Sequence, residues 1–394
     1  MPHSPAHVPA APGSGNLLVH GDLPELTRLY GYSSNTVWTE PQYKIWRERP
    51  DDQVVQPKEG DEHVPGKGAA IGFLVSQGYA VVWGSPLCPA ADYKSVAERF
   101  VAWTHKHKLK PLFCCIDLEM EKVLAADPFN YVVVSCSKED YLDPTVAHDP
   151  SLLDKRVRTK INKAERAGLV IWEESAHLPD QKWQDQAEEG MQAWQANRKG
   201  LQIHVTDLQP WRDVEHRRYF YGRAKPEGKP DGEEKLVGMV VLTRAHDGWV
   251  VKWALEFPYA PKGTSEGMIM HVIETLNKEG HHQLSFGASG GELKAISGIK
   301  GLSFQTLSKT YNGIANAFRL HNKSDFRAKF NAASSPLYIA YAKDSLGMKG
   351  IDAILTALKQ ETYEARGEGE GGDRLQTPAA GMDKPFEFSA QKAE

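Results

Sequence analysis

The chain is organised around residues Trp249–Ala295, WVVKWALEFPYAPKGTSEGMIMHVIETLNKEGHHQLSFGASGGELKA. The apolar start of this stretch predicts a strand, and a loop containing Pro and Gly leads from there into a helix predicted over Thr264–Lys278. A second strand, Gln283–Phe286, is expected to end in a glycine-rich turn, Gly287–Gly291. A strand that opens through such a loop into a helix N-terminus is a common way to hold an anionic or acyl-bearing ligand.

The same alternation of strands and helices continues outward on both sides. Each half of the chain is predicted to hold a hairpin, a helix, a strand, a further helix and a strand. The main predicted elements are hairpins at 68–83 and 236–255, helices at 92–107, 118–126, 152–167 and 180–199, and strands at 111–116, 131–135, 169–173 and 217–223. The expected fold class is therefore α/β with mixed α+β sheets, built as two similar units packed together.

These patterns also predict a domain organisation. Residues 1–15 are expected to be disordered, 16–150 to form the first unit with an N-terminal cover, and 151–345 to form a basic connecting helix and a second, catalytic unit. A C-terminal helix is predicted at 346–362 and a disordered tail at 363–394.

Composition narrows the class of protein. The 394 residues carry a net charge of −4, so any nucleic-acid site must be local rather than a global basic field. The four cysteines lack metal-site or disulfide spacing, and neither the His105/His107 pair nor the His281/His282 pair has further ligands at a suitable distance. No apolar run approaches the ~18 residues of a membrane span. We expect a cytoplasmic chain without a metal, whose contact with lipid is peripheral.

The helix predicted at 152–167 is the strongest candidate for such a local site. An apolar stripe faces the core, so its cations face outward: Lys155, Arg156, Arg158, Lys160, Lys163 and Arg166. A solvated helix face is one interpretation. A ridge that contacts nucleic-acid phosphates is the other.

The sequence disfavours two enzyme classes. Gly287–Gly291 matches GxSxG, but the order of a hydrolase triad fails, because His321 is the only later histidine and no Asp lies between it and Ser289. The pyrophosphate-binding motif of a GNAT acyl-CoA transferase is absent at Pro258–Gly267, where the fold would need it, and occurs only in the acidic tail at 366–371. The glycines at 287–291 are better explained by close approach of the backbone to a ligand.

A set of short motifs, in order and spacing from about Gly68 to Ala342, resembles the C-terminal domain of lysyl-phosphatidylglycerol synthases. They include INKAERAG ending at Gly168, Trp194 with Arg198-Lys199, the loop at 260–263, LSFGA at 284–288, and FRAKF at 326–330 followed by Pro336. The resemblance implies a tandem GNAT fold and the transfer of an aminoacyl group from aminoacyl-tRNA to a lipid hydroxyl.

The chain departs from that family in two ways. The bacterial enzymes carry a membrane-spanning domain that is absent here, and their Asp-Leu-Met-Arg motif is replaced by Trp253-Ala254-Leu255-Glu256. A free-standing form of this kind resembles the fungal steryl-amino-acid synthases, and the ergosteryl-glycine type best. The implied co-substrate is aminoacyl-tRNA with no other cofactor. The implied partners are charged tRNA, the synthetase that supplies it, a sterol or other lipid acceptor, and a membrane or lipid-droplet surface.

Roles follow as hypotheses. Glu256 is predicted to bind the α-ammonium group or to act as the base, and Arg327 and Lys329 to lie near the acceptor end of the tRNA. The turn at Gly287–Gly291 is predicted to offer N–H groups to the oxyanion. Substrate contacts are expected from Trp194, Lys199, Trp253, Ser285, Gly287 and Ser289. Aspartyl transfer, a phosphatidylglycerol acceptor, a tRNA-independent GNAT N-acyltransferase and a non-catalytic RNA-binding relative stay open.

Overall fold

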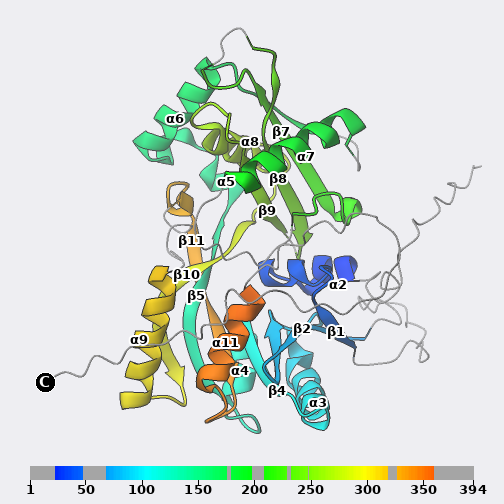
Figure 1. The fold of residues 1–394 in the computed structure, drawn as a ribbon, viewed down its shortest axis with the longest axis vertical. Helices are drawn as coiled ribbons and strands as arrows, with labels where there is room; N and C mark the ends of the chain where they lie inside the picture. Colours follow the sequence, from blue (N-terminus) through cyan, green and yellow to red (C-terminus); the bar gives the residue numbers. More distant parts are fainter. Residues whose placement is uncertain are drawn as a thin grey trace, which may run out of the picture. The chain divides into compact units, whose positions relative to one another are not determined.

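The computed structural model describes residues 23–47, 68–174, 179–197, 208–228, 232–246, 248–317 and 326–358. In this part of the chain, eleven strands form one mixed sheet with the order β1-β2-β3-β4-β11-β5-β10-β9-β8-β7-β6 (Figure 1). The predicted disordered ends at 1–15 and 363–394 lie outside the described residues, and the division at residues 150 and 151 stays a prediction.

The first half of the chain supplies one flank of this sheet. Strands β1 (Lys44–Arg47), β2 (Ala70–Ser76) and β3 (Tyr79–Trp83) pair antiparallel, as the predicted hairpin requires. Helix α3 (Tyr93–Lys106) then crosses to β4 (Lys110–Ile116), which runs parallel to β3. Helix α4 (Leu118–Ala125) and β5 (Val132–Leu142) follow. The N-terminal residues add α2 (Leu23–Tyr30) and the 3-10 helix η1 (Ser33–Val37).

The second half repeats that order of elements. Its elements are α5 (Pro144–Ala147), α6 (Lys155–Arg166), β6 (Val170–Glu174), α7 (Gln181–Ala196), β7 (Arg217–Ala224), β8 (Lys235–Ala245), β9 (Gly248–Glu256), α8 (Thr264–Lys278), β10 (Leu284–Ser297), α9 (Gly301–Ala317), β11 (Ala333–Tyr341) and α11 (Gly347–Leu358). The antiparallel pair β8–β9 is followed by α8 and by β10, which is parallel to β9. Because β2–β3, α3 and β4 have the same arrangement, the predicted mixed α/β fold of two GNAT-like units is confirmed.

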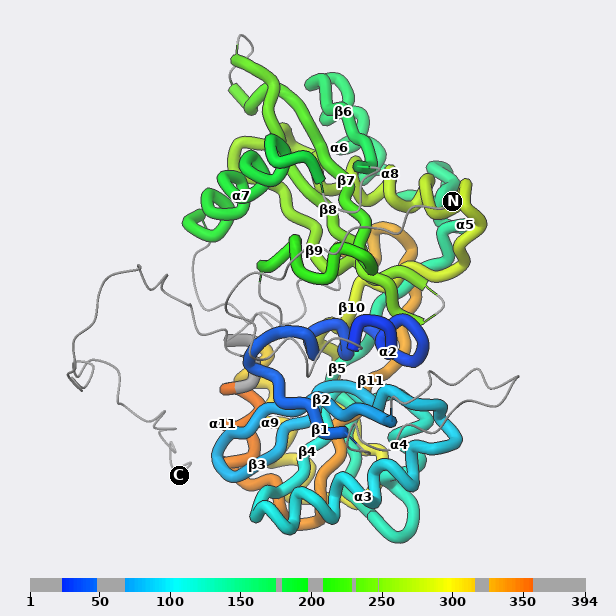
Figure 2. Tube along the Cα trace, turned by 90° about the vertical axis from the view of Figure 1, so that its right-hand side faces the viewer, coloured from blue at the N-terminus to red at the C-terminus, as the bar shows by residue number. Residues whose placement is uncertain are grey.

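Strand β11 crosses between the halves. It comes late in the chain, yet it pairs antiparallel with both β4 and β5 of the first half (Figure 2). Strand β5 therefore has β11 on one edge and β10 on the other. Strand β11 supplies the backbone hydrogen-bond partners that lie between β4 and β5. The strands of the first half therefore form a continuous sheet only together with a strand of the second half.

The predicted glycine-rich turn at Gly287–Gly291 is wrong. These residues continue β10, and the residues from Gly287 to Gly290 pair with Asp140–Ser137 of β5. Only Gly287 has a positive φ, +78°, at a register shift between Ser285 and Gly287. The backbone pairs with β5, which itself extends to Leu142 instead of ending near Ser135. A bulge thus replaces the turn.

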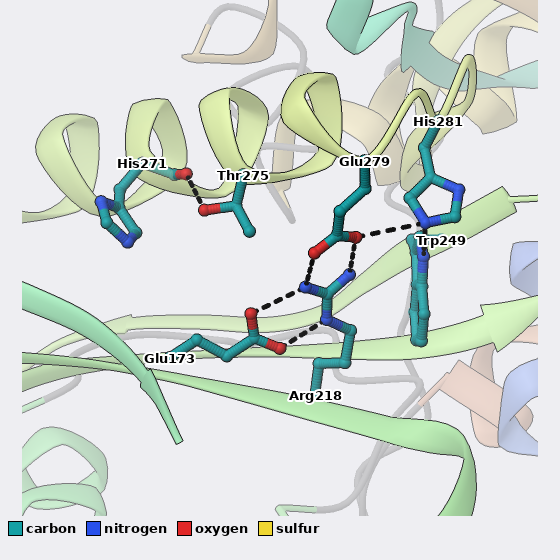
Figure 3. A network of polar contacts seen from close by, with 7 residues as sticks. All are labelled: Glu173, Arg218, Trp249, His271, Thr275, Glu279 and His281. Atoms are coloured by element: carbon teal, nitrogen blue, oxygen red, sulfur yellow. Dashed lines mark hydrogen bonds and ion pairs between the residues drawn. The ribbon is translucent and has the colours of Figure 1, made fainter. Parts of the chain in front are cut away.

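A charged network joins β6, β7 and the end of α8 in the second half (Figure 3). Arg218 on β7 donates from Nε and Nη2 to Glu173 on β6, at 2.5 and 2.7 Å, and from Nη1 and Nη2 to Glu279 after α8, both at 2.6 Å. Glu279 also lies 3.3 Å from His281, which accepts from the Trp249 ring nitrogen at 3.4 Å. One guanidinium therefore fixes the end of α8 against the outer strands.

Candidate functional site

Strands β9 and β10 separate soon after they begin. They are parallel but pair only at Trp249 with Leu284 and at Val250 with Ser285, after which β10 follows β5. The helix η1 lies against β10 there, and the Ser33 side chain would be 3.8 Å from a Cβ placed on Gly287. After Ser285, β10 is therefore no longer paired with β9.

A buried polar cluster lies on β10 beside that separation. Arg327 Nη1 donates to Asp140 Oδ2 at 3.0 Å and to the Gly287 carbonyl oxygen at 2.8 Å. Ser285 Oγ donates to Glu139 Oε1 at 2.5 Å and accepts from Gly287 N–H at 3.0 Å. The structure thus brings together three predicted site residues, Ser285, Gly287 and Arg327, with two carboxylates from β5.

Arg327 is held on one side and available on the other. Its side chain is 13% exposed and that of Asp140 is 4% exposed. Burial lowers the pKa of the Arg327 guanidinium, and Asp140 opposes that effect. Among the described residues, none accepts a hydrogen bond from its Nε or Nη2. Those two donors can therefore bind a carbonyl, carboxylate or phosphate oxygen.

Lys329 lies two residues further on, in the turn before β11. Its Nζ stands 5.3 Å from the centre of the Phe326 ring, and Phe326 in turn contacts Phe330 edge-on at 5.5 Å. Phe330 is fully buried and Phe326 is half-buried. The two aromatic rings anchor the segment that carries Arg327 and Lys329.

The side chain of Glu256, the last residue of β9, reaches the N-terminus of α8. Its Oε2 accepts from the Ser265 N–H at 2.7 Å, and burial, the larger effect, raises the pKa of its carboxyl. Beside it, the buried Glu266 accepts from Lys160 Nζ of α6 at 2.5 Å. A Cβ on Gly263 would lie 2.2 Å from the Lys160 carbonyl oxygen, so α6 packs directly on the start of α8. The chain's own carboxylates take the place that an anionic ligand would take at this helix end.

Helix α6 presents its cations to solvent, as predicted. Val157 and Ala164 are buried, and the six basic side chains are exposed: Lys155, Arg156, Arg158, Lys160, Lys163 and Arg166. Lys160 pairs with Glu266, whereas no acidic side chain in the described part of the chain pairs with the other five. An unneutralised cationic face of this kind suits a polyanionic partner.

The two predicted tryptophans belong to one apolar cluster. Trp253 is 6% exposed and packs with Tyr219 and Phe257, and the half-buried Trp194 packs against the same cluster. The Arg217 guanidinium lies 4.9 Å from the Trp253 ring. Ser289 is buried in β10, and its Oγ has no hydrogen-bond partner among the described residues. Lys199 lies outside the described residues.

Sequence reasoning missed the acidic half of the site. Asp140 and Glu139 were predicted to lie beyond the end of a strand, although three consecutive charges at 138–140 were the available signal. It also missed a buried ion pair, in which Lys252 Nζ on β9 lies 3.2 Å from Glu40 Oε1 and donates to the Thr36 carbonyl oxygen at 2.8 Å. This pair fixes the residues after η1 against β9.

No group of three or more His, Cys, Asp or Glu side chains among the described residues is arranged to hold a metal ion. No helix in that part of the chain is both long enough and apolar enough to cross a membrane.

The mixed sheet and its two similar halves define the fold class of this chain as mixed α/β and GNAT-like. The chain belongs to one family of that class: residues 56–341 match the family described as phosphatidylglycerol lysyltransferase, C-terminal. None of the curated proteins matches the sequence.

Solved structures agree with the fold. The C-terminal domain of a putative lysylphosphatidylglycerol synthetase from Agrobacterium fabrum is 13% identical with a TM-score of 0.66, over 87% of this chain and 96% of that one. The L-PGS structure from Bacillus licheniformis is 14% identical with a TM-score of 0.63, over 86% and 95%. FemX is 9% identical with a TM-score of 0.50, over 82% and 96%. At these identities the likeness shows the fold alone.

Proposed function

We propose that this protein transfers an aminoacyl group from aminoacyl-tRNA to a lipid hydroxyl, and that the group is glycyl and the acceptor the 3β-hydroxyl of ergosterol. The observation that carries the proposal is the junction of α6 and α8. There Glu256 bonds to the start of α8, and directly on it lies a helix with five cations that pair with no acidic side chain among the described residues.

That junction favours tRNA over acyl-CoA as the donor. A helix N-terminus binds a diphosphate through free N–H groups and a positive dipole. Here Ser265 N–H is already bonded to Glu256, and the buried Glu266 is paired with Lys160. A coenzyme A diphosphate would meet the Glu256 carboxyl group at this helix end, whereas a longer polyanion can follow the exposed face of α6.

The chemistry is a transesterification. The acceptor hydroxyl oxygen attacks the ester carbonyl carbon of the aminoacyl-tRNA, and the bond from that carbon to the ribose oxygen breaks. The proton leaving the acceptor hydroxyl ends on the released ribose oxygen, so atoms and charge balance without an external reactant. Alignment of the two substrates and support of the oxyanion supply most of the rate.

Five residues are assigned roles in this proposal. Arg327 contacts the donor end through Nε and Nη2, which have no acceptor among the described residues, because its Nη1 is bonded to Asp140 and Gly287. Lys329, anchored by Phe326, lies beside it and adds positive charge near the terminal phosphates. Glu256 is the candidate base, because its burial raises its pKa toward the working pH. The two tryptophans, Trp194 and Trp253, supply apolar surface suited to a rigid ring system.

The test combines donor and acceptor in one assay. The protein is incubated with charged tRNA and a lipid extract, with and without ribonuclease, and lipids are examined by mass spectrometry. Ribonuclease-sensitive formation of glycyl-ergosterol is expected. Aspartyl-ergosterol or an aminoacylated phosphatidylglycerol keeps the reaction class and replaces the substrate. Product formed from acyl-CoA alone, or tRNA binding without any product, contradicts the proposal.

A matched pair of variants tests the role of α6. Arg158→Glu with Lys163→Glu reverses two unpaired cations, and leaves Lys160 with Glu266. We expect about tenfold weaker tRNA binding and a salt dependence reduced by about two phosphate contacts. Lys94→Glu with Lys278→Glu, two exposed lysines on other helices, is the control. Equal binding by the two double variants would remove α6 from the interface.

A further inference from the structure

We infer that one end of the first half's sheet, which we call the basic apolar end, docks on the surface of an anionic lipid bilayer. It consists of six exposed lysines and two strongly exposed apolar side chains: Lys106, Lys108, Lys110, Lys300, Lys343, Lys349, Leu302 and Met348. The inference rests on the proposed lipid acceptor and adds the surface by which the chain would reach it.

Strand register places these residues at the same end. On the two sides of β5, Ser297 of β10 and Ala340 of β11 both pair with Val133. Helices α9 and α11 start shortly after those strands and pack on the same apolar cluster (Figure 1). Their first turns, which carry Leu302 and Met348, therefore begin at one level of the sheet.

The lysine-rich turn after α3 belongs to this end as well. Lys110 opens β4 and pairs with Tyr79, while Leu112 of β4 pairs with Tyr341 near the end of β11. The β2–β3 turn is tied to α11 by a hydrogen bond of 3.1 Å from Gln77 to Asp352. The loops before β4, after β10 and after β11 thus share one edge of the fold.

The apolar side chains here are unusually open to solvent. Leu302 is 78% exposed and Met348 is 64% exposed, and the bulged Ile296 just before α9 is 45% exposed. In α9 the half-buried Leu307 and Tyr311 face the sheet, and Tyr311 donates to the carbonyl oxygens of Cys136 and Gly291 at 2.7 and 2.6 Å. By helical spacing, Leu302 points away from that packed side.

Charge selects an anionic surface as the partner. Near the six lysines lie three exposed acids, on a chain whose net charge is −4: Asp127 before β5, Asp344 after β11 and Asp352 in α11. No described acidic side chain forms an ion pair with any of the six. Lysines around protruding apolar side chains match a bilayer, where the cations meet headgroups and the apolar groups enter the acyl boundary. A nucleic acid would use the lysines but leave Leu302 and Met348 in water.

Vesicle sedimentation of the full chain tests the inference. The probes are phosphatidylcholine vesicles with and without phosphatidylserine, in the absence of tRNA. We expect binding only when phosphatidylserine is present. Leu302→Ser with Met348→Ser, and separately Lys108→Gln with Lys349→Gln, are each expected to weaken it about tenfold. Val146→Ser with Val170→Ser removes two other exposed apolar groups, 59% and 47% exposed, and is expected to bind as the wild type.

The outcomes separate this inference from the proposed function. Unchanged vesicle binding by both double variants overturns the docking surface, as does a loss of tRNA binding, instead of vesicle binding, in the lysine variant. Transfer to an acceptor held in detergent micelles should stay within twofold of wild type in both, because micelles remove the need for a bilayer. Absence of transfer in every protein, wild type included, contradicts the function and leaves the vesicle result standing.

Discussion

The ion pair between Asp140 and Arg327 lies within the candidate site, and substitution of Asp140 tests its role. Asp140→Asn keeps a hydrogen-bond acceptor but leaves the guanidinium buried without its counter-charge. We expect a loss of about 2 kcal/mol in the free energy of unfolding, measured by urea denaturation. Aminoacyl transfer should fall further than stability explains, because Arg327 loses its fixed direction.

Lys138→Gln is the control for that variant. Its Nζ lies 3.6 Å from Asp140, and its side chain is 33% exposed, so we expect a change within about 0.5 kcal/mol. Equal effects of the two substitutions would show that Asp140 acts through general surface charge instead of through Arg327.

Lys252 gives a pH-dependent prediction. Burial, the larger effect, lowers its pKa to about 8 from 10.5, against the opposing charge of Glu40. Between pH 8 and about 10.5 the unfolded chain therefore binds more protons at this residue, and stability contributed by this group rises with pH. At about 1.4 kcal/mol per pKa unit, burial of the charged lysine lowers the free energy of unfolding at neutral pH by roughly 3 kcal/mol.

Two variants measure that contribution. Lys252→Met alone should destabilise the fold by about 3 kcal/mol, because Glu40 stays buried without its lysine. Adding Glu40→Gln should restore most of the loss. The difference in unfolding free energy between wild type and the double variant, followed from pH 7 to pH 10, should move in favour of the wild type. A flat difference would place the Lys252 pKa near its ordinary value.

The sequence predicted Arg327 but not its partner, for a physical reason. The two residues are 187 positions apart, and their segments come together because β11, which follows Arg327, pairs with β5, which contains Asp140. Local patterns report periodicity and turn chemistry, which is why most helices and strands were predicted within a few residues. They carry no information about which distant strand lies alongside. Glu40 and Lys252, 212 positions apart, escaped prediction in the same way.

At the scale of elements, the contact of α6 with α8 depends on one glycine. Gly263 has φ +98°, and an added Cβ would lie 2.2 Å from the Lys160 backbone. Gly263→Ala should therefore lift α6 and cost about 3 kcal/mol or more, measured by thermal unfolding. Gly168→Ala is the matched control, since its φ is +80° but nothing lies within 4 Å, so only about 1 kcal/mol of backbone strain is expected.

The tRNA affinity of these two variants connects the element to function. If α6 must sit on α8 to present its cations, Gly263→Ala should weaken tRNA binding, while Gly168→Ala should not. Equal tRNA affinity of the two variants would mean that α6 binds tRNA without being packed on α8.

Strand β10 shows where element prediction failed. Four glycines or serines between 287 and 291 are typical of a turn. Pairing with β5 on one edge overrides that local preference, and only Gly287 uses the freedom of a positive φ. The stretch remains part of the site, but through the Gly287 carbonyl that holds Arg327 instead of through a turn of N–H groups.

For the whole molecule, the pairing of β11 with β4 and β5 of the first half predicts cooperative unfolding. Strand β5 is hydrogen-bonded to β11 and β10 along most of its length, so melting of the second half would remove both of its neighbours. We expect a single calorimetric transition whose calorimetric and van't Hoff enthalpies agree. Hydrogen exchange at β5 and at β8 should then report the same free energy of opening. Two resolved transitions would show that the halves are independent domains. A fragment of residues 68–150 that folds without β11 would show that β4 and β5 do not need this strand.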